Sequence, residues 1–578
     1  MQFRTFYAQD TQGNVIPGAT VAVRQPNTTT EVTVFDENDG ALSGIVTDAV
    51  GRFAFAAPNG AYDIFIEKGA LTATLENENF SDTSLFDGIW FASATTILAD
   101  TELTYTTGRN GSVVAGDLIN TNDGLTYEVA ASGASNEHVT TAGGVKLYVR
   151  KVLGKYPLRA FGAAGDGTTN DSAAIQLAFN AASADVVGND FGSLANNGTI
   201  QITGEGLPYR IGSEVEIPTL TGVKIVDAYF WATDAFSDSY MFATPASGTP
   251  GYSGVINTFF ENCHFDANRR GGCVYIDDYI HAGLRKCYVR HFSTYGFRSG
   301  PQGVEAMVFE SRLEEYTTTE TDINNRGAHI GTAVYFGSTD SELVDCVLGV
   351  SLLHVGAASN VSPRISGCHF FYHASVTELF TSFDLTGSVT ITDSFFDQCG
   401  IGIKDPSSCI ITGNRWLVLA GTTAGNPVML EPQSANYTLS NFICHTNRVI
   451  NNTGSSLAFC VESGPGSFNA ANLIDVAIYD NIGPNLIRTS TRAKASQAFS
   501  STGLSGTIDV SFGSMICFGD IQQISDSLYR NFLPGSAPYM PQRQITSINN
   551  STYTLSFNLE FNVSGTIYAE IDTSKYRT

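Results

Sequence analysis

Charged side chains are scarce in this chain: Asp, Glu, Lys and Arg together make up 15% of its 578 residues. The sequence also lacks any run of about 18 apolar residues, so we expect no transmembrane helix. Its first residues, MQFRTFYAQD, lack the apolar stretch of a signal peptide, which predicts synthesis in a cytoplasm without export by the ordinary secretory route. A chain poor in charge but containing 57 Gly, 37 Phe and 24 Tyr is typical of a rigid, β-rich protein.

Positively charged residues are fewer than negatively charged residues. Lys and Arg total 31 against 56 Asp and Glu, which gives a formal net charge of −25. A nucleic-acid partner is therefore disfavoured, because phosphate binding requires a basic surface, and attachment to an anionic membrane is disfavoured for the same reason. A neutral polysaccharide suits such a chain, whereas an anionic polysaccharide would require a local basic groove.

Cysteine is absent before Cys263, although the whole chain contains ten. No Cys-x2-Cys pair, H-E-x-x-H motif or G-x-S-x-G elbow occurs, so we predict no metal site and no bound cofactor. A large chain with its own core does not require disulfides. We therefore expect the cysteines to be free thiols that pack as small hydrophobic residues.

A six-residue pattern recurs along the middle of the chain. It reads apolar, any residue, polar or Gly, small, any residue, apolar, as in Phe260–Phe265 and Leu284–Val289. A period of about 20–25 residues with occasional insertions indicates a solenoid. Units this short, and this rich in β-branched and turn residues, favour strands over helix pairs. The small residue, Cys, Ser or Asn, stands at positions 263, 287, 311, 346, 368, 394, 414 and 447.

The polar or Gly third position predicts a bend between two short strands. On an unbroken strand the two apolar ends of the pattern would face opposite sides, because side chains alternate with period two. A bend lets the small residue and the final apolar residue both point inward. Coils of this kind stacked about 4.8 Å apart form a parallel β-helix in which like residues lie over like.

Two positions of the pattern then point outward. Aromatic rings stack on pyranose rings, and charged groups bind hydroxyls, so a face of this composition suits a chain-like sugar; the alternative is a solvated face with scattered aromatic residues. The fifth position forms one column: His264, Tyr288, Arg312, Val347, His369, Phe395, Arg415 and Arg448. The position after the last apolar residue forms a second: Asp266, Arg290, Glu314, Gly349, Phe371, Asp397 and Leu417. We predict as substrate-binding residues His264, Tyr288, Arg312, His369 and Arg415.

Strand and turn patterns divide the chain into four parts. The pattern in residues 1–70 predicts a small β-sandwich, and the pattern in residues 71–156 predicts a connecting β region. Residues 157–492 contain a capping helix followed by the β-helix. Residues 493–578 begin with a linker to about residue 506 and continue with alternating stretches that fit a terminal β-sandwich.

The stretch Leu158–Gln176 marks the start of the solenoid. Asp166-Gly167 predicts a turn, and the candidate helix N-caps that follow are Asn170, Asp171 and Ser172. A solenoid end requires such a capping helix, because it hides the core and the strand edges of the first coil. The apolar residues that share one face of the helix are Ala174, Ile175, Ala178, Phe179 and Ala182.

From Ala160 to Phe179 the sequence resembles the opening motif of the pectate-lyase-superfamily β-helix in bacteriophage tailspike depolymerases. The resemblance implies an all-β homotrimer whose right-handed parallel β-helix covers residues 157 to about 490. It further implies an N-terminal region that attaches to a phage tail or baseplate protein in the virion. The β-helix would bind and cleave a bacterial surface polysaccharide, either capsule or O-antigen, and the C-terminal domain would serve trimerisation or glycan contact. The motif itself carries no catalytic residues.

Glycoside hydrolysis requires one protonated and one ionised carboxyl group, about 5–5.5 Å apart for retention and 6.5–9.5 Å apart for inversion. One candidate cluster lies beside the insertion 315–340 and comprises Glu310, Glu314 and Glu315. Another is the pair Asp393 and Asp397, three coils away, or about 14 Å, which is too far for one pair on one subunit. Because long insertions carry function more often than tight turns, the glutamates are favoured. Bend carboxylates such as Asp393 have the alternative role of accepting backbone N–H bonds.

Two other functions fit the same outward face. A polysaccharide lyase would remove a proton beside a uronate and neutralise its carboxylate, for which the chain offers His264, Tyr288, Arg312, His369 and Arg415. A spike that binds without cutting is the third possibility, because a β-helix alone does not imply an enzyme. We expect hydrolysis by paired carboxylates.

Overall fold

The computed structural model describes residues 2–10, 12–36, 40–58, 60–80, 89–105, 112–186, 200–245, 254–314, 331–349, 353–359, 361–371, 380–381, 383–419, 426–469, 473–500, 505–512, 523–531, 543–551, 553–560 and 564–573. The chain divides into two compact units. Met1–Ser132 and Thr141–Val145 form the first unit, and Gly133–Thr140 and Lys146–Thr578 form the second.

The first unit is built from short strands around an aromatic core. Phe55 is fully buried and stacks on Phe80, with ring centroids 5.1 Å apart. The sheet extends beyond the predicted boundary at residue 70, because β6 pairs along β5 in antiparallel register. Its strands are β1 (Gln2–Tyr7), β2 (Thr20–Arg24), β3 (Ile45–Val46), β4 (Arg52–Ala57), β5 (Gly60–Lys68) and β6 (Leu71–Phe80).

Among its described residues, the rest of this unit contains one short helix and several small strands. The turn Asn122-Asp123-Gly124 joins two antiparallel strands, as its sequence predicts. The elements are β7 (Ile89–Phe91), α1 (Ala94–Leu98), β8 (Thr104–Tyr105), β9 (Ser112–Val113), β10 (Leu118–Thr121) and β11 (Thr126–Val129).

The second unit begins with β12 (Val139–Thr140), β13 (Lys146–Val149), the 3-10 helix η2 (Leu158–Phe161) and the helix α2 (Ser172–Ala184). The predicted capping helix is therefore present. Ile175, Ala178, Phe179 and Ala182 are buried on one face of α2. The Phe179 ring lies 6.1 Å from that of Phe242, so the helix covers the core of the first coils.

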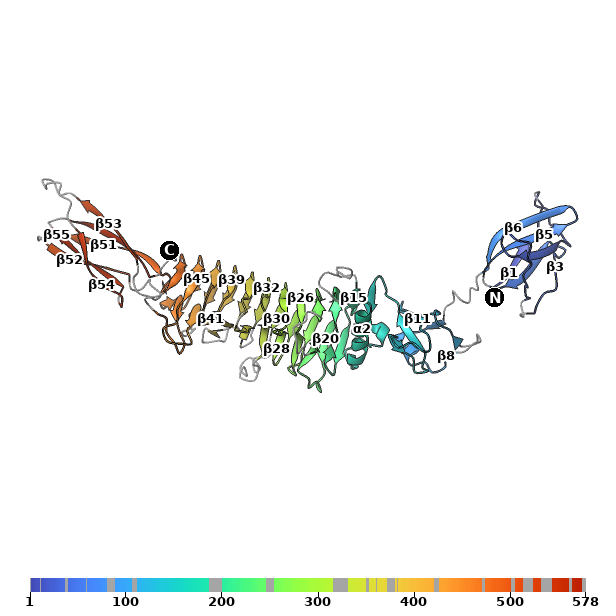
Figure 1. Cartoon of the computed structure of the whole chain (residues 1–578), viewed down its shortest axis with the longest axis horizontal. Coiled ribbons are helices and arrows are strands. Elements are labelled where there is room, and N and C mark those ends of the chain that lie inside the picture. The colour runs from blue at the N-terminus through green and yellow to red at the C-terminus, as the bar shows by residue number, and fades with distance from the viewer. Residues whose placement is uncertain are drawn as a thin grey trace. The chain divides into compact units, whose positions relative to one another are not determined.

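Three parallel sheets form the walls of the solenoid, which is a right-handed parallel β-helix (Figure 1). The first sheet contains β14 (Lys155–Pro157), β15 (Ile200–Thr203), β19 (Val223–Val226), β23 (Phe259–Glu261), β26 (Tyr279–Arg285), β29 (Val304–Phe309), β32 (Glu342–Val344), β35 (Arg364–Ser366), β39 (Thr390–Thr392), β42 (Ile410–Thr412), β45 (Ser440–His445) and β49 (Ile474–Tyr479), with β18 (Leu220–Thr221) and β22 (Val255–Ile256) beside this path.

The second sheet contains β16 (Pro208–Ile211), β20 (Tyr229–Ala232), β24 (His264–Asp266), β27 (Tyr288–Arg290), β30 (Arg312–Glu314), β33 (Val347–Gly349), β36 (His369–Phe371), β40 (Phe395–Asp397), β43 (Arg415–Val418) and β46 (Arg448–Asn451). The third contains β17 (Val215–Glu216), β21 (Tyr240–Ala243), β25 (Gly272–Ile276), β28 (Tyr295–Ser299), β31 (Thr332–Phe336), β34 (Leu353–Ala357), β38 (Phe383–Thr386), β41 (Cys399–Lys404), β44 (Val428–Glu431) and β48 (Cys460–Glu462), with β37 (Phe380–Thr381) paired to β41.

The corner between the first and second sheets repeats the six-residue pattern. Its third residue adopts a left-handed conformation in every predicted copy, with φ between +47° and +70°, so the predicted bend is confirmed. The fourth residue is buried in each copy. Toward the end of the solenoid the small residues form an asparagine ladder, in which the backbone N–H of Asn414 donates to Oδ1 of Asn447 at 3.0 Å and that of Asn447 donates to Asn481.

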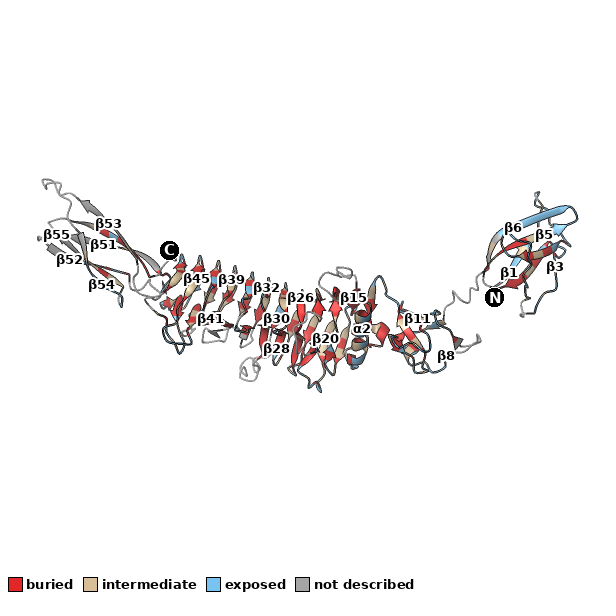
Figure 2. Ribbon diagram, viewed as in Figure 1, coloured by how far each residue is buried: buried red, intermediate tan, exposed pale blue. Residues whose placement is uncertain are grey.

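Buried residues follow the solenoid along its length (Figure 2), and most of them are apolar. Phe370, Phe396 and Trp416 stack in consecutive coils, with ring centroids 5.0 and 4.8 Å apart. The nine described cysteines are buried and free, which confirms their predicted role as core thiols; Cys517 lies outside the described residues.

The C-terminal part contains two three-stranded antiparallel sheets. Val510 and Phe557 of one sheet and Ile567 and Ile571 of the other share one buried cluster. Residues 492–500 form a strand, so most of the predicted linker is part of a sheet. The strands are β51 (Arg492–Ser500), β56 (Ser564–Asp572) and β53 (Gln523–Asn531) in one sheet, and β52 (Ser505–Ser511), β55 (Thr554–Glu560) and β54 (Arg543–Asn549) in the other. β47 (Leu457–Ala458) and β50 (Leu486–Ile487) pair separately. Among the described residues, no helix is long and apolar enough to cross a membrane.

Candidate functional site

The outer face of the second sheet carries the two predicted columns in register. His264 pairs with Tyr288, Tyr288 with Arg312, and the series continues to Arg448. Asp266, Arg290 and Glu314 are paired in the same way in the second column. Residues at these positions are therefore neighbours about 4.8 Å apart along the stack, although 24 or more residues often separate them in the sequence.

Three aromatic rings form a ladder at the start of the first column. The Tyr229 ring centroid lies 4.2 Å from that of His264, which in turn lies 4.7 Å from that of Tyr288. Each side chain is half-buried and comes from a different coil, namely β20, β24 and β27. We call these three residues the ring ladder. It offers a continuous aromatic surface along the solenoid.

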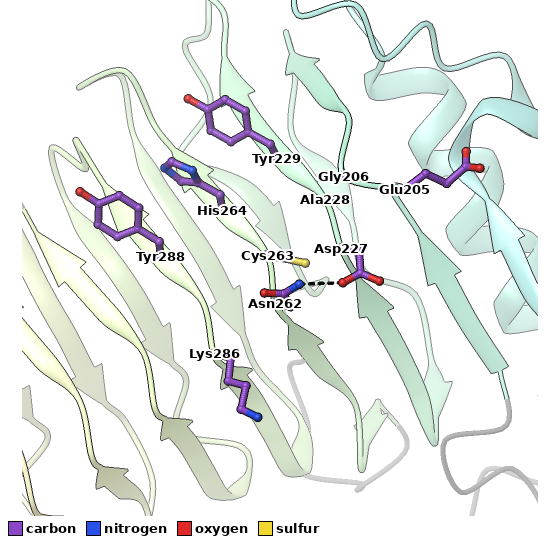
Figure 3. Close-up of a pocket in the computed structure, with 10 residues that line it drawn as sticks. All are labelled: Glu205, Gly206, Asp227, Ala228, Tyr229, Asn262, Cys263, His264, Lys286 and Tyr288. Carbon is purple, nitrogen blue, oxygen red and sulfur yellow. Dashed lines mark hydrogen bonds between the residues drawn. The ribbon is translucent and has the colours of Figure 1, made fainter.

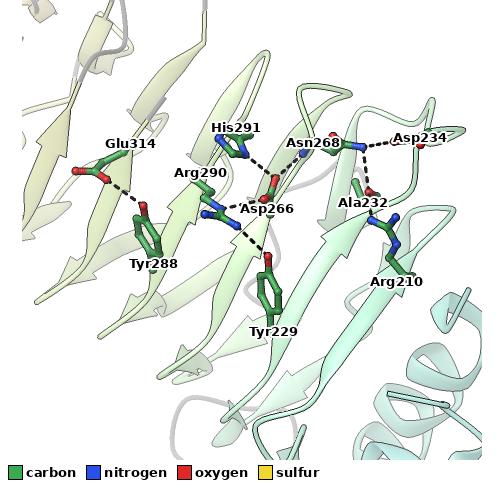
Figure 4. Close-up of polar contacts among 10 residues, drawn as sticks. All are labelled: Arg210, Tyr229, Ala232, Asp234, Asp266, Asn268, Tyr288, Arg290, His291 and Glu314. Carbon is green, nitrogen blue, oxygen red and sulfur yellow. Dashed lines mark hydrogen bonds and ion pairs between the residues drawn. The ribbon is translucent and has the colours of Figure 1, made fainter. Parts of the chain in front are cut away.

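A buried ion pair fixes one end of the ring ladder. Arg290 donates through Nε to Oδ2 of Asp266 at 2.9 Å and through Nη2 to the Tyr229 hydroxyl at 3.0 Å (Figure 4). Asp266 Oδ1 lies 3.0 Å from Nδ1 of His291 and accepts the backbone N–H of Asn268. Burial alone would raise the pKa of Asp266, but the hydrogen bond with His291 and the charge of Arg290 outweigh it, so the pKa is lowered. Asp266 is therefore an anion at neutral pH.

A second carboxylate, that of Glu314, contacts the other end of the ring ladder. The Tyr288 hydroxyl donates to Oε2 of Glu314 at 3.1 Å, and Arg312 Nη2 lies 2.5 Å from Oε1 of the same group. The Glu314 side chain is 3% exposed, whereas that of Arg312 is 56% exposed. Glu314 is thus a buried carboxylate with one fixed partner, Tyr288, and one partner that solvent reaches.

An open depression of about 550 Å³ lies beside the ring ladder (Figure 3). Its remaining wall includes the bend residues Asp227, Asn262 and Lys286, with Glu205 at one end. Lys286 is ion-paired with Glu310 of the next coil, and Glu205 with Arg159. The described cations of this region are therefore matched by carboxylates, so it is not a basic groove.

His264 is a neutral imidazole within this site. Burial is the main reason that its pKa falls to about 4, and the positive charge of Arg290 adds to the effect. Its Nε2 is buried without a hydrogen-bond partner among the described residues. The ring therefore contributes an uncharged flat surface and an unused polar atom between two tyrosines.

The predicted glutamate cluster is divided by the bend. Glu310 is the bend residue itself, is exposed, and pairs with Lys286 at 3.5 Å. Glu314 lies at the end of β30 on the second sheet. Glu315 lies outside the described residues. Of this cluster, the structure brings only Glu314 into contact with the ring ladder among the described residues.

The predicted aspartate pair is divided in the same manner. Asp393 is an exposed bend residue with φ +51°, and Asp397 ends β40. Asp397 lies near His369, whose ring contacts Phe395 at 5.0 Å between centroids. Burial raises the pKa of Asp397, and His369 opposes the shift. Arg415 follows Phe395 in the first column and is exposed, away from the ring ladder.

Two members of the site were not recognised as such from the sequence. Tyr229 belongs to an earlier copy of the pattern, Ile225–Phe230, whose small residue is Ala228 rather than Cys, Ser or Asn. His291 stands one residue beyond β27, where the pattern makes no assignment. A search that allowed Ala at the small position would have found Tyr229. Among the described residues, no group of three His, Cys, Asp or Glu side chains is placed to hold a metal ion.

Comparison with known proteins identifies solved structures that have a similar fold. No protein-family model and no curated protein matches the chain. ORF18 of Geobacillus virus E2 is 12% identical with a TM-score of 0.44, over 82% of this chain and 90% of that one. The tailspike protein gp49 from Pseudomonas phage LKA1 is 11% identical with a TM-score of 0.36, over 72% and 100%. PfbA, a surface adhesin of Streptococcus pneumoniae, is 12% identical with a TM-score of 0.38, over 63% and 99%. Several other phage tailspike proteins are similar in the same way, and function must be argued from this chain's own residues.

Proposed function

We propose that this protein is a phage spike that binds a bacterial surface polysaccharide on the outer face of the second sheet and cleaves it there by hydrolysis. The observation that carries the proposal is the ring ladder of Tyr229, His264 and Tyr288 beside an open depression of about 550 Å³. The three rings are tilted by 35° and 38° against one another and offer an aromatic surface on which pyranose rings can pack. The hydroxyl groups of Tyr229 and Tyr288 and the nearby carboxylates can form hydrogen bonds with sugar hydroxyls.

The charge of this surface favours a sugar that is not strongly anionic. Arg290 and Arg312 are each ion-paired with a carboxylate, and Asp227 and Glu205 add negative charge to the depression. A uronate placed here would displace one of these carboxylates from its cation. The binding energy would therefore come mainly from ring stacking and hydrogen bonds.

Glu314 is the carboxyl group best placed to protonate a leaving oxygen. A sugar that draws the exposed Arg312 away leaves Glu314 buried beside the Tyr288 hydroxyl alone. A carboxyl group at this buried position can act as a general acid toward a glycosidic oxygen bound beside it. The ionised partner would be Asp266, two strand spacings away, about 9.6 Å, which is too long for retention and marginally beyond the separation of about 6.5–9.5 Å for inversion.

β-Elimination is the second chemistry that a specific observation favours. His264 is neutral at physiological pH and lies between two tyrosines, so it suits the abstraction of a proton. That route requires a uronate substrate, which the paired charges of the site disfavour. Hydrolysis is the better supported reaction.

The test uses purified protein with capsule and lipopolysaccharide preparations from a panel of bacterial strains. Hydrolysis predicts falling viscosity and new reducing ends without the ultraviolet absorbance of an unsaturated uronate. That absorbance would instead identify a lyase. Binding to a polysaccharide without any fall in viscosity would remove the enzymatic part of the proposal.

Substitution of Glu314 tests the assignment within the site. We expect Glu314→Gln to lower the cleavage rate by about 10²–10⁴-fold, the range for loss of a general acid, while polysaccharide binding persists. Glu310→Gln is the matched control, because it changes an exposed glutamate four residues earlier on the far side of the bend. Asp397→Asn tests the rival carboxyl group three coils away. Loss of cleavage in Asp397→Asn with full activity in Glu314→Gln would move the reaction to that position.

A further inference from the structure

The third sheet carries a cluster of tyrosines around Arg298 that the site above does not use. Arg298, on β28, faces outward between Tyr275 of the preceding coil and Tyr335 of the following coil, with which it is in register. The centre of its guanidinium lies 5.5 Å from each of these ring centroids and 4.9 Å from that of Tyr295. Three ring faces from three coils therefore surround one cation.

A fourth tyrosine completes the cluster. Arg298 donates through Nη1 to the Tyr240 hydroxyl at 3.2 Å, and the Tyr240 ring stacks on Tyr275 with centroids 5.1 Å apart. Tyr240 lies flat across Gly272, where a methyl group would come within 2.5 Å of the ring. The absence of a side chain at Gly272 therefore leaves the space that the Tyr240 ring occupies. We call Tyr240, Tyr275, Tyr295, Arg298 and Tyr335 the tyrosine cluster.

The charge of the tyrosine cluster differs from that of the second sheet. Among the described residues Arg298 has no ion-paired carboxylate; the groups that raise its pKa are the tyrosines. Asp277 is buried and is engaged with the Tyr275 hydroxyl and the backbone N–H of Gln302, and Glu214 accepts the backbone N–H of Tyr240. The tyrosine cluster therefore carries a local positive charge in a chain whose net charge is −25.

The composition of the tyrosine cluster indicates the kind of ligand. Its outward side chains are phenols and one guanidinium, with no aliphatic residue among them, and all except the buried Tyr240 are half-buried. The phenol hydroxyls and the ring edges can contact a pyranose, and a guanidinium offers positive charge and N–H donors to a carboxylate. Tyr and Arg are also enriched at protein–protein interfaces, so the oligomeric state is part of the test.

We propose that the tyrosine cluster is a second carbohydrate site, which takes an acidic sugar and holds its carboxylate on Arg298. This site lies on a different sheet from the ring ladder and serves binding rather than cleavage. It would let the protein hold an acidic surface glycan while the second sheet acts on another part of the polysaccharide. The proposal does not depend on the cleavage reaction.

Calorimetric titration with two acidic probes, tri-galacturonic acid and tri-N-acetylneuraminic acid, tests this site, with maltotriose as the neutral comparison. We expect at least one acidic probe to bind, more weakly as salt is raised, and the affinity to fall at least tenfold in Arg298→Gln. Tyr335→Ala, which removes one ring at the surface, should weaken the same binding and guards against a folding defect in the first variant. Arg364→Gln is the matched control, because Arg364 is an exposed arginine of the first sheet paired with Glu342.

The proposal would be overturned if neither acidic probe bound the protein. It would equally be overturned if the affinity were unchanged in Arg298→Gln, or if binding were abolished by His264→Ala in the ring ladder. A change of oligomeric state in Arg298→Gln without any sugar binding would assign the tyrosine cluster to a contact between copies of the chain, which also contradicts it.

Discussion

At the scale of single residues, the bend decides which side chains meet. Glu310 and Glu314 are close in sequence, yet the left-handed bend at Glu310 directs them to different sides of the corner. Asp266, Arg290 and Glu314 are distant in sequence, yet they are successive neighbours in one column. The chemistry of the site therefore comes from the stacking of coils, and Asp266 with Arg290 is its most buried ion pair.

Removal of the Asp266 carboxylate should destabilise the solenoid in a pH-dependent way. The folded-state pKa of Asp266 is lowered, so its contribution is present above the unfolded value of about 3.9 and is lost as pH falls through the folded pKa. We expect Asp266→Asn to lose about 3 kcal/mol at pH 7, because Arg290 is left without its buried partner. Thermal melting of both proteins at neutral and at acidic pH measures the difference.

The difference between Asp266→Asn and the unchanged protein should shrink below about pH 4. Glu342→Gln is the control, since the Glu342–Arg364 pair has an arginine that is 65% exposed and should contribute little. Equal melting at pH 7, or a gap that stays constant as the pH is lowered, would show that Asp266 does not act in this way.

At the scale of elements, the stacking of coils leaves no room for some side chains. Gly283 lies in β26 between Phe259 and Met307 of the adjacent coils. A methyl group on Gly283 would come within 1.9 Å of the Met307 carbonyl oxygen, which is backbone and has nowhere to move. Gly283 has φ +156°, a backbone conformation that directs an added Cβ at the neighbouring strand, so glycine is required at this position.

Substitution of Gly283 by Ala should destabilise the solenoid more than an equivalent change at an open turn. Gly454 has φ +78°, and a methyl group added to it would have no described atom within 4 Å, so Gly454→Ala should lose about 1 kcal/mol for its left-handed backbone alone. We expect Gly283→Ala to lose a further 1–3 kcal/mol, roughly the range for overpacking. Chemical unfolding of the two variants makes the comparison; equal losses would contradict the close approach of these strands.

The periodic pattern was sufficient to predict the solenoid, the bend and the two outward columns. This succeeded because burial imposes the same residue types on every coil. The pattern could not predict the pairing of Tyr229 with Arg290, since that contact crosses two coils and one of them carries Ala228 at the small position. Nor could it show that Glu310 and Asp393 are bend residues turned away from the column, because sequence proximity suggested clusters that the backbone divides.

At the scale of the whole molecule, the chain combines a net charge of −25 with a proposed binding face whose charges are paired. Such a face gains little from long-range attraction and depends on contact over several coils. We propose that the protein is a homotrimer, as the resemblance of residues 160–179 to tailspike depolymerases implies. Light scattering should give three times the chain mass of 61.7 kDa, and a single-chain mass would contradict this expectation.

The position of a bound oligosaccharide tests the central claim most directly. A crystal structure of the Glu314→Gln variant with a fragment of the polysaccharide that the protein cleaves should show sugar rings stacked on Tyr229, His264 and Tyr288, with one glycosidic oxygen beside residue 314. Sugar bound on another face of the solenoid, with the ring ladder unoccupied, would contradict the account.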